Sequence, residues 1–235
     1  MKILVSLFIL LLVNYFLIAE NFRNEDYLIL FGIYKSQEIS KFVNLKNYQI
    51  PTKGRNLFLQ KEVAESLERM YLDLKKEHPN IEFWIASAAR TYWDQKHIWE
   101  LKWKQFSFLT PDSRVKKILE YSSMPGTSRH HWGTDFDINV LENSYYEKEN
   151  GKILWDWLSK NAVKYGFCMP YNENRSSGYL LEKWHWSYKK IALVYQKKWN
   201  EYFAQKKINF LDFSGKEFFT EFAPIYVNSI NPECL

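Results

Sequence analysis

Five polar side chains in this sequence have the types and the spacing of a hydrolytic metal site. They are His130 and Asp137 in SRHHWGTDFD, Glu182 and His185 in EKWHW, and Arg90 in SAARTYWDQ. A zinc ion that performs chemistry keeps about three protein ligands and one open position. Two imidazoles and one carboxylate leave a net positive charge there, which acidifies a bound water molecule toward a pKa of about 7. His130, Asp137 and His185 are therefore the candidate zinc ligands.

Glu182 precedes His185 by three residues, which places a carboxylate beside the candidate metal. Such a carboxylate can take a proton from water and deliver it to a leaving amine. On a flat strand, residues an odd number apart point to opposite faces. The sequence therefore predicts a bend, a bulge or a turn between Glu182 and His185.

A lone histidine is more typical of a structural or surface position than of a metal ligand. We expect His78, His97 and His131 to be structural or surface residues of this kind. Three of the five histidines nevertheless lie near Gly-rich or strand-bounding turns with acidic residues close by, and this combination favours a metal site.

The elements that must position these residues alternate between helix and strand without the regular period of βαβ units. Periodicity and turn residues predict helices over 57–77, 93–103, 111–121, 153–165 and 189–207, and strands over 81–86, 134–140 and 179–188. Gly166 is expected to cap the fourth helix. This order favours an α+β domain with a small antiparallel sheet and flanking helices.

Composition limits the class of protein. The 235 residues are 46% hydrophobic and 25% charged, which suits one globular domain and excludes a disordered chain, a collagen-like repeat and a polytopic membrane protein. Aromatic residues make up 18%, which fits either a cleft for sugar-like or peptide-like ligands or a mere compositional habit. The net charge of +5 is scattered, so we expect no nucleic-acid partner, although attraction to an anionic cell wall or membrane surface stays open.

The N-terminus and the cysteines bear on the compartment. Lys2 precedes an almost unbroken apolar run over residues 3–18, so we expect residues 1–20 to be a signal peptide or an uncleaved signal anchor. The alternative is a buried N-terminal helix of a cytoplasmic protein. Cys168 and Cys234 can pair in an oxidising compartment, but the sequence slightly favours two unpaired thiols.

Three segments together resemble one known family. SRHHWGTDFD resembles the Ser-x-His-x-x-Gly-x-x-x-Asp signature of the vancomycin-resistance type of D-alanyl-D-alanine carboxypeptidase, a family of zinc peptidases whose fold is related to the hedgehog signalling domain. EKWHW resembles its Glu-x-Trp-His element, and IASAARTYWDQ resembles its Ser-x-x-Arg-x-x-x-x-Gln segment. The segments follow the family's order and cover about residues 57–190.

The resemblance implies one zinc ion per chain, held by His130, Asp137 and His185. It implies that Glu182 is the general base. It also implies that Arg90 lies over the scissile carbonyl, where a permanent cation stabilises the developing oxyanion.

Two further positions, Ser128 and Gln95, match residues that contact substrate in the family. From their surroundings in the sequence alone, Ser128 is equally suited to capping a turn and Gln95 to facing solvent. Together with the apolar N-terminal run, the resemblance divides the chain into four parts. They are a signal peptide or signal anchor, an N-terminal extension, the zinc peptidase domain and a C-terminal tail packed on it, at residues 1–20, 21–56, 57–207 and 208–235.

The chain departs from the family pattern at a few positions. Asp135 stands where the family usually has Ala, and it can tune the metal site or hold a ligand histidine. Lys183 replaces a usual Pro, and Ala88 and Ala89 replace a common Gly and Tyr beside Arg90. These changes leave every proposed ligand in place and bear on substrate preference.

The function implied is that of an exported, monomeric carboxypeptidase of the periplasm or cell envelope, which is attached to the membrane if its signal segment is not cleaved. It would release C-terminal D-alanine from peptidoglycan stem peptides. The alternatives are a peptidoglycan endopeptidase, which needs a groove open at both ends of the site, and a non-catalytic zinc-containing domain that binds wall or a partner. A metal-dependent nuclease using His130 and His131 would require a basic phosphate-tracking surface.

Overall fold

The computed structural model describes residues 25–53, 56–208 and 210–235. The predicted signal segment, residues 1–20, lies outside this part of the chain. No helix in the described ranges is long and apolar enough to cross a membrane.

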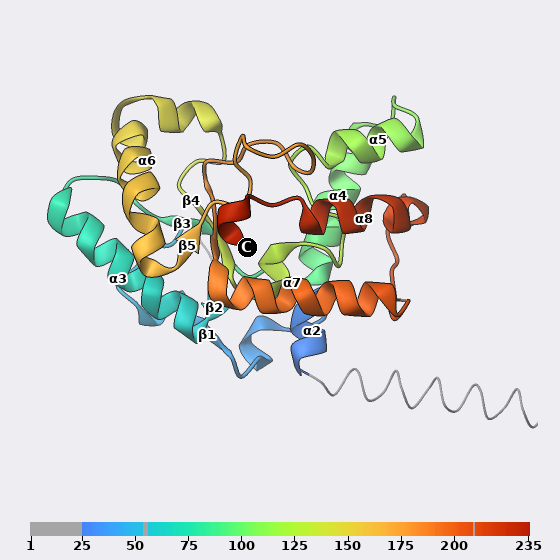
Figure 1. Ribbon diagram of the computed structural model, residues 1–235, viewed down its shortest axis with the longest axis horizontal. Helices are drawn as coiled ribbons and strands as arrows, with labels where there is room; N and C mark the ends of the chain where they lie inside the picture. Colours follow the sequence, from blue (N-terminus) through green and yellow to red (C-terminus); the bar gives the residue numbers. More distant parts are fainter. Residues whose placement is uncertain (1–24, 54–55, 209) are drawn as a thin grey trace, which may run out of the picture.

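A four-stranded antiparallel sheet forms the centre of the molecule, in the order β3-β4-β6-β5 (Figure 1). Its strands are β3 (Ile85–Ser87), β4 (Asp135–Ile138), β5 (Phe167–Cys168) and β6 (His185–Tyr188). A separate two-stranded sheet pairs β1 (Phe42–Asn44) with β2 (Phe58–Gln60). Small antiparallel sheets among helices confirm the predicted α+β class.

Helices lie on both sides of the central sheet. They are α2 (Glu25–Phe31), α3 (Lys61–Glu77), α4 (Tyr92–Gln105), α5 (Pro111–Ile118), α6 (Glu149–Asn161), α7 (Lys189–Ala204) and α8 (Phe219–Asn228). Figure 1 shows α3 and α6 to one side of the sheet, and α2, α4, α5 and α8 to the other. One hydrophobic cluster packs the apolar face of the sheet against α3 and α6, and a second cluster is formed mainly by α2, α4, α5, α7 and α8. The other face of the sheet carries polar side chains, among them Asp135, Asp137 and His185.

Helix α4 begins at a capping box directly after Arg90. The Thr91 side chain accepts a hydrogen bond from the backbone N–H of Asp94, and the Asp94 carboxylate accepts from the N–H of Thr91. This pair satisfies backbone donors that a helix start leaves open. The box therefore determines where the chain leaves β3 and enters α4, and it fixes the backbone next to Arg90.

The register of the central strands brings distant residues to one face. Asp137 of β4 lies opposite His185 of β6, and Asp135 lies opposite Ser187. Residues two apart on a strand share a face. Asp135, Asp137 and His185 are thus neighbours although almost fifty residues separate the two strands.

The predicted strands at 81–86 and 179–188 are too long. Only Ile85–Ser87 and His185–Tyr188 belong to the sheet. Residues 179–184 instead bond irregularly to other segments: the N–H of Leu180 donates to Glu120 O, and that of Glu182 donates to Tyr171 O. Tertiary partners, rather than local pattern, decide the conformation of this stretch.

Cys168 and Cys234 form a disulfide bond, with their Cα atoms 5.6 Å apart. The interpretation of two unpaired thiols is therefore wrong. After α8 the chain returns to the segment that follows β5, where the Asn231 N–H donates to Pro170 O at 2.9 Å. Because 66 residues separate the two cysteines, no local pattern indicated that they would meet.

Replacing Cys234 with Ser is expected to lower the free energy of unfolding by about 2–4 kcal/mol, because the bridge restricts the unfolded chain. Urea unfolding followed by fluorescence measures the difference. Reduced wild-type protein is the control and should match the variant. Equal unfolding free energies for the oxidised wild type and the variant would contradict the prediction.

Candidate active site

His130, Asp137 and His185 converge on one point. One nitrogen from each imidazole and one carboxylate oxygen all lie within 4.8 Å of one another. His130 Nε2 is 3.3 Å from Asp137 Oδ2, and His185 Nδ1 is 3.0 Å from Asp137 Oδ1. All three side chains are buried. Two imidazoles and one carboxylate are donors that suit zinc, so the set is able to hold that ion.

A tight turn positions His130. The residue lies in the 3₁₀ turn Arg129–Trp132, which ends at Gly133 with a φ of +63°. A Cβ at Gly133 would lie 2.6 Å from the Phe42 ring, so both the conformation and the packing require glycine. The Nδ1–H of His130 donates to the Ala88 carbonyl at 2.9 Å, which leaves Nε2 free to face Asp137.

His185 is held between two carboxylates. Its Nε2 is 3.0 Å from Asp135 Oδ1, on the side away from the Nδ1 that meets Asp137. Burial alone would lower the pKa of His185, but the hydrogen bonds to Asp135 and Asp137 outweigh burial and raise the pKa to about 9. Without a metal the imidazole is protonated at neutral pH.

Asp135 is itself tied into a buried polar network. Its Oδ1 accepts from Arg129 Nε at 3.0 Å and its Oδ2 accepts from Ser187 Oγ at 3.0 Å. Burial disfavours the charged form, yet Arg129 and His185 together hold the pKa of Asp135 well below its usual range. Asp135 therefore contacts the candidate ligand His185 at Nε2, the ring nitrogen that does not face Asp137. It is not one of the three converging donors.

Glu182 lies beside the candidate ligands. Its Oε2 is 3.6 Å from His185 Nδ1, and the side chain is 5% exposed. A turn at residues 183–184, in which the His185 N–H donates to Glu182 O at 3.2 Å, brings both side chains to one side. The predicted irregularity is confirmed. Burial, with Asp137 nearby, raises the pKa of Glu182 to about 8.

Arg90, which follows β3, also approaches the candidate ligand Asp137. Its Nη2 lies 3.7 Å from Asp137 Oδ2 and donates to Ser87 Oγ at 2.9 Å, while Nη1 donates to Gln95 Oε1 at 2.8 Å. The Gln95 amide in turn donates to Ser123 O at 2.8 Å. Gln95 is fully buried and does not line the cavity, so the structure makes it a support of the guanidinium.

These groups open onto a cavity of about 680 Å³. Ser128 lines it with a buried hydroxyl that has no hydrogen-bond partner among the described residues. Two lining residues were not expected from the sequence. The Tyr171 ring lies 4.7 Å from the His185 ring, and Lys102 Nζ lies 2.6 Å from Ser122 Oγ. Neither belongs to a motif, so no local pattern identified them.

His131 has the structural role expected of it. Its Nδ1–H donates to Arg90 O at 2.7 Å, and its Nε2 accepts from the Gly126 N–H at 3.2 Å. Burial lowers its pKa to about 3, so the ring is neutral. His131 thereby links the backbone at Arg90 to the turn that carries His130.

Comparison with known proteins identifies related sequences. The VanY D-alanyl-D-alanine carboxypeptidase family matches residues 56–191. YodJ of Bacillus subtilis (strain 168) is 31% identical over 169 residues, which cover 68% of this chain and 59% of that protein. A D-alanyl-D-alanine carboxypeptidase of Enterococcus faecium is 23% identical over 205 residues, which cover 81% of this chain and 61% of that protein. The chain thus spans about three fifths of the length of these relatives.

Solved structures share the fold. The LdcB LD-carboxypeptidase, in a structure that addresses peptidoglycan recognition, aligns with a TM-score of 0.52 and 24% identity over 70% of this chain and 78% of that one. VanYB in complex with D-alanine-D-alanine aligns with a TM-score of 0.50 and 19% identity over 68% of this chain and 90% of that one. At identities below 25%, these alignments show a shared fold.

We expect Asp135→Asn to weaken zinc binding about 10- to 100-fold, because Asn keeps the size of the side chain but loses the charge that holds His185. Competition with a chromophoric chelator measures the affinity. Ser187→Ala is the matched control, since it removes a hydrogen bond from Asp135 without touching His185. Wild-type affinity in Asp135→Asn, or an equal loss in both variants, would contradict this role.

Zinc binding near neutral pH is expected to release at least one proton per site, because the metal replaces the proton that a pKa of about 9 keeps on His185. The apparent affinity should therefore rise with pH until the pH passes about 9. Calorimetry in buffers of different ionisation enthalpy counts the protons. An affinity that is independent of pH over this range would be inconsistent with a protonated His185.

Proposed function

The chain belongs to the VanY family of D-alanyl-D-alanine carboxypeptidases, and on this premise we propose that it is an exported zinc carboxypeptidase that releases C-terminal D-alanine from peptidoglycan stem peptides. The observation that carries the proposal is the convergence of three buried donors at a cavity that also contains Glu182 and Arg90.

The donor set fits a catalytic zinc ion. His130, Asp137 and His185 would hold the ion, and the remaining imidazole nitrogens are already hydrogen-bonded to Ala88 O and Asp135. Three protein donors leave a position open for solvent or substrate. When bound, zinc supplies Lewis-acid polarisation of the substrate carbonyl and makes a water molecule more acidic.

Glu182 and Arg90 perform the other parts of the reaction. The Glu182 carboxylate accepts a proton from the attacking water and passes it to the amine nitrogen of the leaving D-alanine. A cation held by His130, Asp137 and His185 would lower the raised pKa of Glu182, so that its carboxylate would be available as the base. Arg90, held in place by Gln95 and Ser87, stabilises the negative oxygen that forms on the carbonyl carbon.

A cationic group in the cavity favours a carboxypeptidase over an endopeptidase. Lys102 lines the cavity. Burial lowers the pKa of Lys102, while Glu182 opposes the shift. An ammonium group beside the reacting residues is suited to bind the free carboxylate of a terminal D-alanine. The Ser128 hydroxyl, which has no hydrogen-bond partner within the described ranges, is able to add a hydrogen bond to the same carboxylate.

The disulfide supports the proposed export. Disulfide bonds persist in the periplasm and outside the cell, and they are rare in the cytosol. The Cys168–Cys234 bridge therefore agrees with the predicted signal segment.

We expect Glu182→Ala to keep its zinc and to lose about 10²- to 10⁴-fold in kcat, because a general base contributes about that much. His130→Ala is the matched control, and it is expected to lose zinc as well as turnover. Metal analysis and mass spectrometry of products from defined pentapeptide and tetrapeptide muropeptides provide the measurements. Undiminished turnover in Glu182→Ala would exclude it as the base, and release of no D-alanine by the wild type would exclude the activity. Cleavage confined to cross-linked dimers would instead identify an endopeptidase.

A further inference from the structure

A second cavity adjoins the active site on the far side of Arg90. Its volume is about 1490 Å³, which exceeds the roughly 300–1,000 Å³ of pockets that enclose a small ligand. We call it the lateral groove; its lining includes residues 33–39, 56–58, 86–91, Trp93, Asp94 and His97. Arg90 lines both cavities, and its Nη2 contacts Ser87 of the groove as well as approaching Asp137. The two cavities are therefore adjacent along one side chain.

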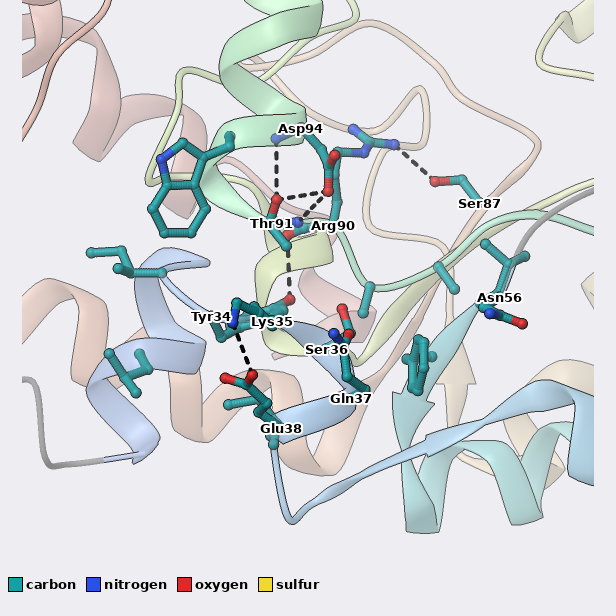
Figure 2. Close-up of a pocket in the computed structure, with 18 of the residues that line it drawn as sticks. Tyr34, Lys35, Ser36, Gln37, Glu38, Asn56, Ser87, Arg90, Thr91 and Asp94 are labelled. Atoms are coloured by element: carbon teal, nitrogen blue, oxygen red, sulfur yellow. Dashed lines mark hydrogen bonds and ion pairs between the residues drawn. The ribbon is translucent and has the colours of Figure 1, made fainter.

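The two walls of the lateral groove come from different parts of the chain. Figure 2 shows Ser36 and Gln37 on one side, facing Ser87 and Arg90 on the other. The first wall precedes residue 56, where the match to the family begins. Ala88 and Ala89 are small, which leaves the groove open up to Arg90. This groove is thus partly a feature of the chain outside the matched region.

Each described charged side chain that lines the groove has a hydrogen-bond or ion-pair partner within the chain. Lys35 Nζ lies 3.0 Å from Glu38 Oε1, and Asp94 is engaged in the helix cap. Glu25 accepts from the backbone and hydroxyl of Ser40, and Arg90 is held by its own partners. Among the described lining residues two cations, Lys35 and Arg90, face three carboxylates, so the groove presents no surplus of positive charge. This balance disfavours an anionic ligand and suits a neutral one.

The remaining lining groups suit a carbohydrate. Trp93 is 55% exposed at the start of α4, so one large flat apolar face meets solvent. Gln37 and Asn56 are exposed, and Ser36 is partly exposed. A pyranose ring has an apolar C–H face that stacks on an indole, and its hydroxyl and N-acetyl groups pair with amides and hydroxyls.

We propose that the lateral groove binds the glycan of peptidoglycan, a neutral chain of N-acetylated amino sugars, with a sugar ring stacked on Trp93. The direction of the bound polymer rests on the proposed function: a stem peptide attached to this glycan passes Arg90 and presents its C-terminus to Glu182 and the metal ligands. The groove thereby makes wall-attached peptides better substrates than free ones.

A tetramer of N-acetylglucosamine is the probe that tests this inference. Calorimetry is expected to show saturable binding to the wild-type chain and about five- to tenfold weaker binding to Trp93→Ala, the loss expected for one aromatic contact. Leu101→Ala is the matched control, because Leu101 is 56% exposed on the same helix but lies outside the groove lining. It should bind the probe as the wild type does.

Absence of binding to the wild type, or equal losses in Trp93→Ala and Leu101→Ala, would overturn the inference. The inference would also be overturned if Trp93→Ala weakened the binding of a free stem peptide more than it weakened the binding of the sugar probe. A second measurement compares kcat/KM for a disaccharide-linked and a free pentapeptide, and the ratio should fall in Trp93→Ala. Because the sugar probe contains no peptide bond, its binding succeeds or fails independently of the hydrolysis tested with Glu182→Ala.

Discussion

Two negative charges buried on one face of β4 determine how the site is built. Asp135 and Asp137 are at most 2% exposed. An unpaired charge at such depth costs several kcal/mol, so positive partners must lie close. Arg129 pairs with Asp135, and His185 lies 3.0 Å from a carboxylate oxygen of each aspartate. Arg90 Nη2 also lies 3.7 Å from Asp137 Oδ2. A divalent cation bound here would take the place of the proton on His185, between two imidazoles and Asp137.

The loops around this centre are held by contacts with both ends of the described chain. The N–H of Glu182 donates to Tyr171 O at 3.0 Å, which ties Glu182 to the tyrosine that lines the cavity. Directly before Tyr171, Pro170 O accepts from the N–H of Asn231, and the disulfide fixes the neighbouring strand to the same C-terminal segment. The position of Glu182 thus depends on residues that carry no catalytic chemistry.

The sequence predicted which side chains converge better than it predicted the residues that support them. Residue types and spacing indicated His130, Asp137 and His185, and strand pleating predicted the turn before His185. The alternation of helices and strands predicted the α+β class. The role of Asp135 stayed open because it depends on the register between β4 and β6. The interior position of Gln95 and the disulfide depend on packing between segments far apart, which local patterns do not encode.

The turn that carries His130 is packed against segments that precede residue 56. Trp132 Nε1 donates to Leu30 O at 3.1 Å, and the Tyr34 hydroxyl donates to His131 O at 2.8 Å. The ring of Phe42 also occupies the space beside Gly133. The family match, residues 56–191, is therefore shorter than the packed unit that holds the turn of His130. A fragment cut to those limits would keep the candidate zinc ligands and lose part of the scaffold that aims them.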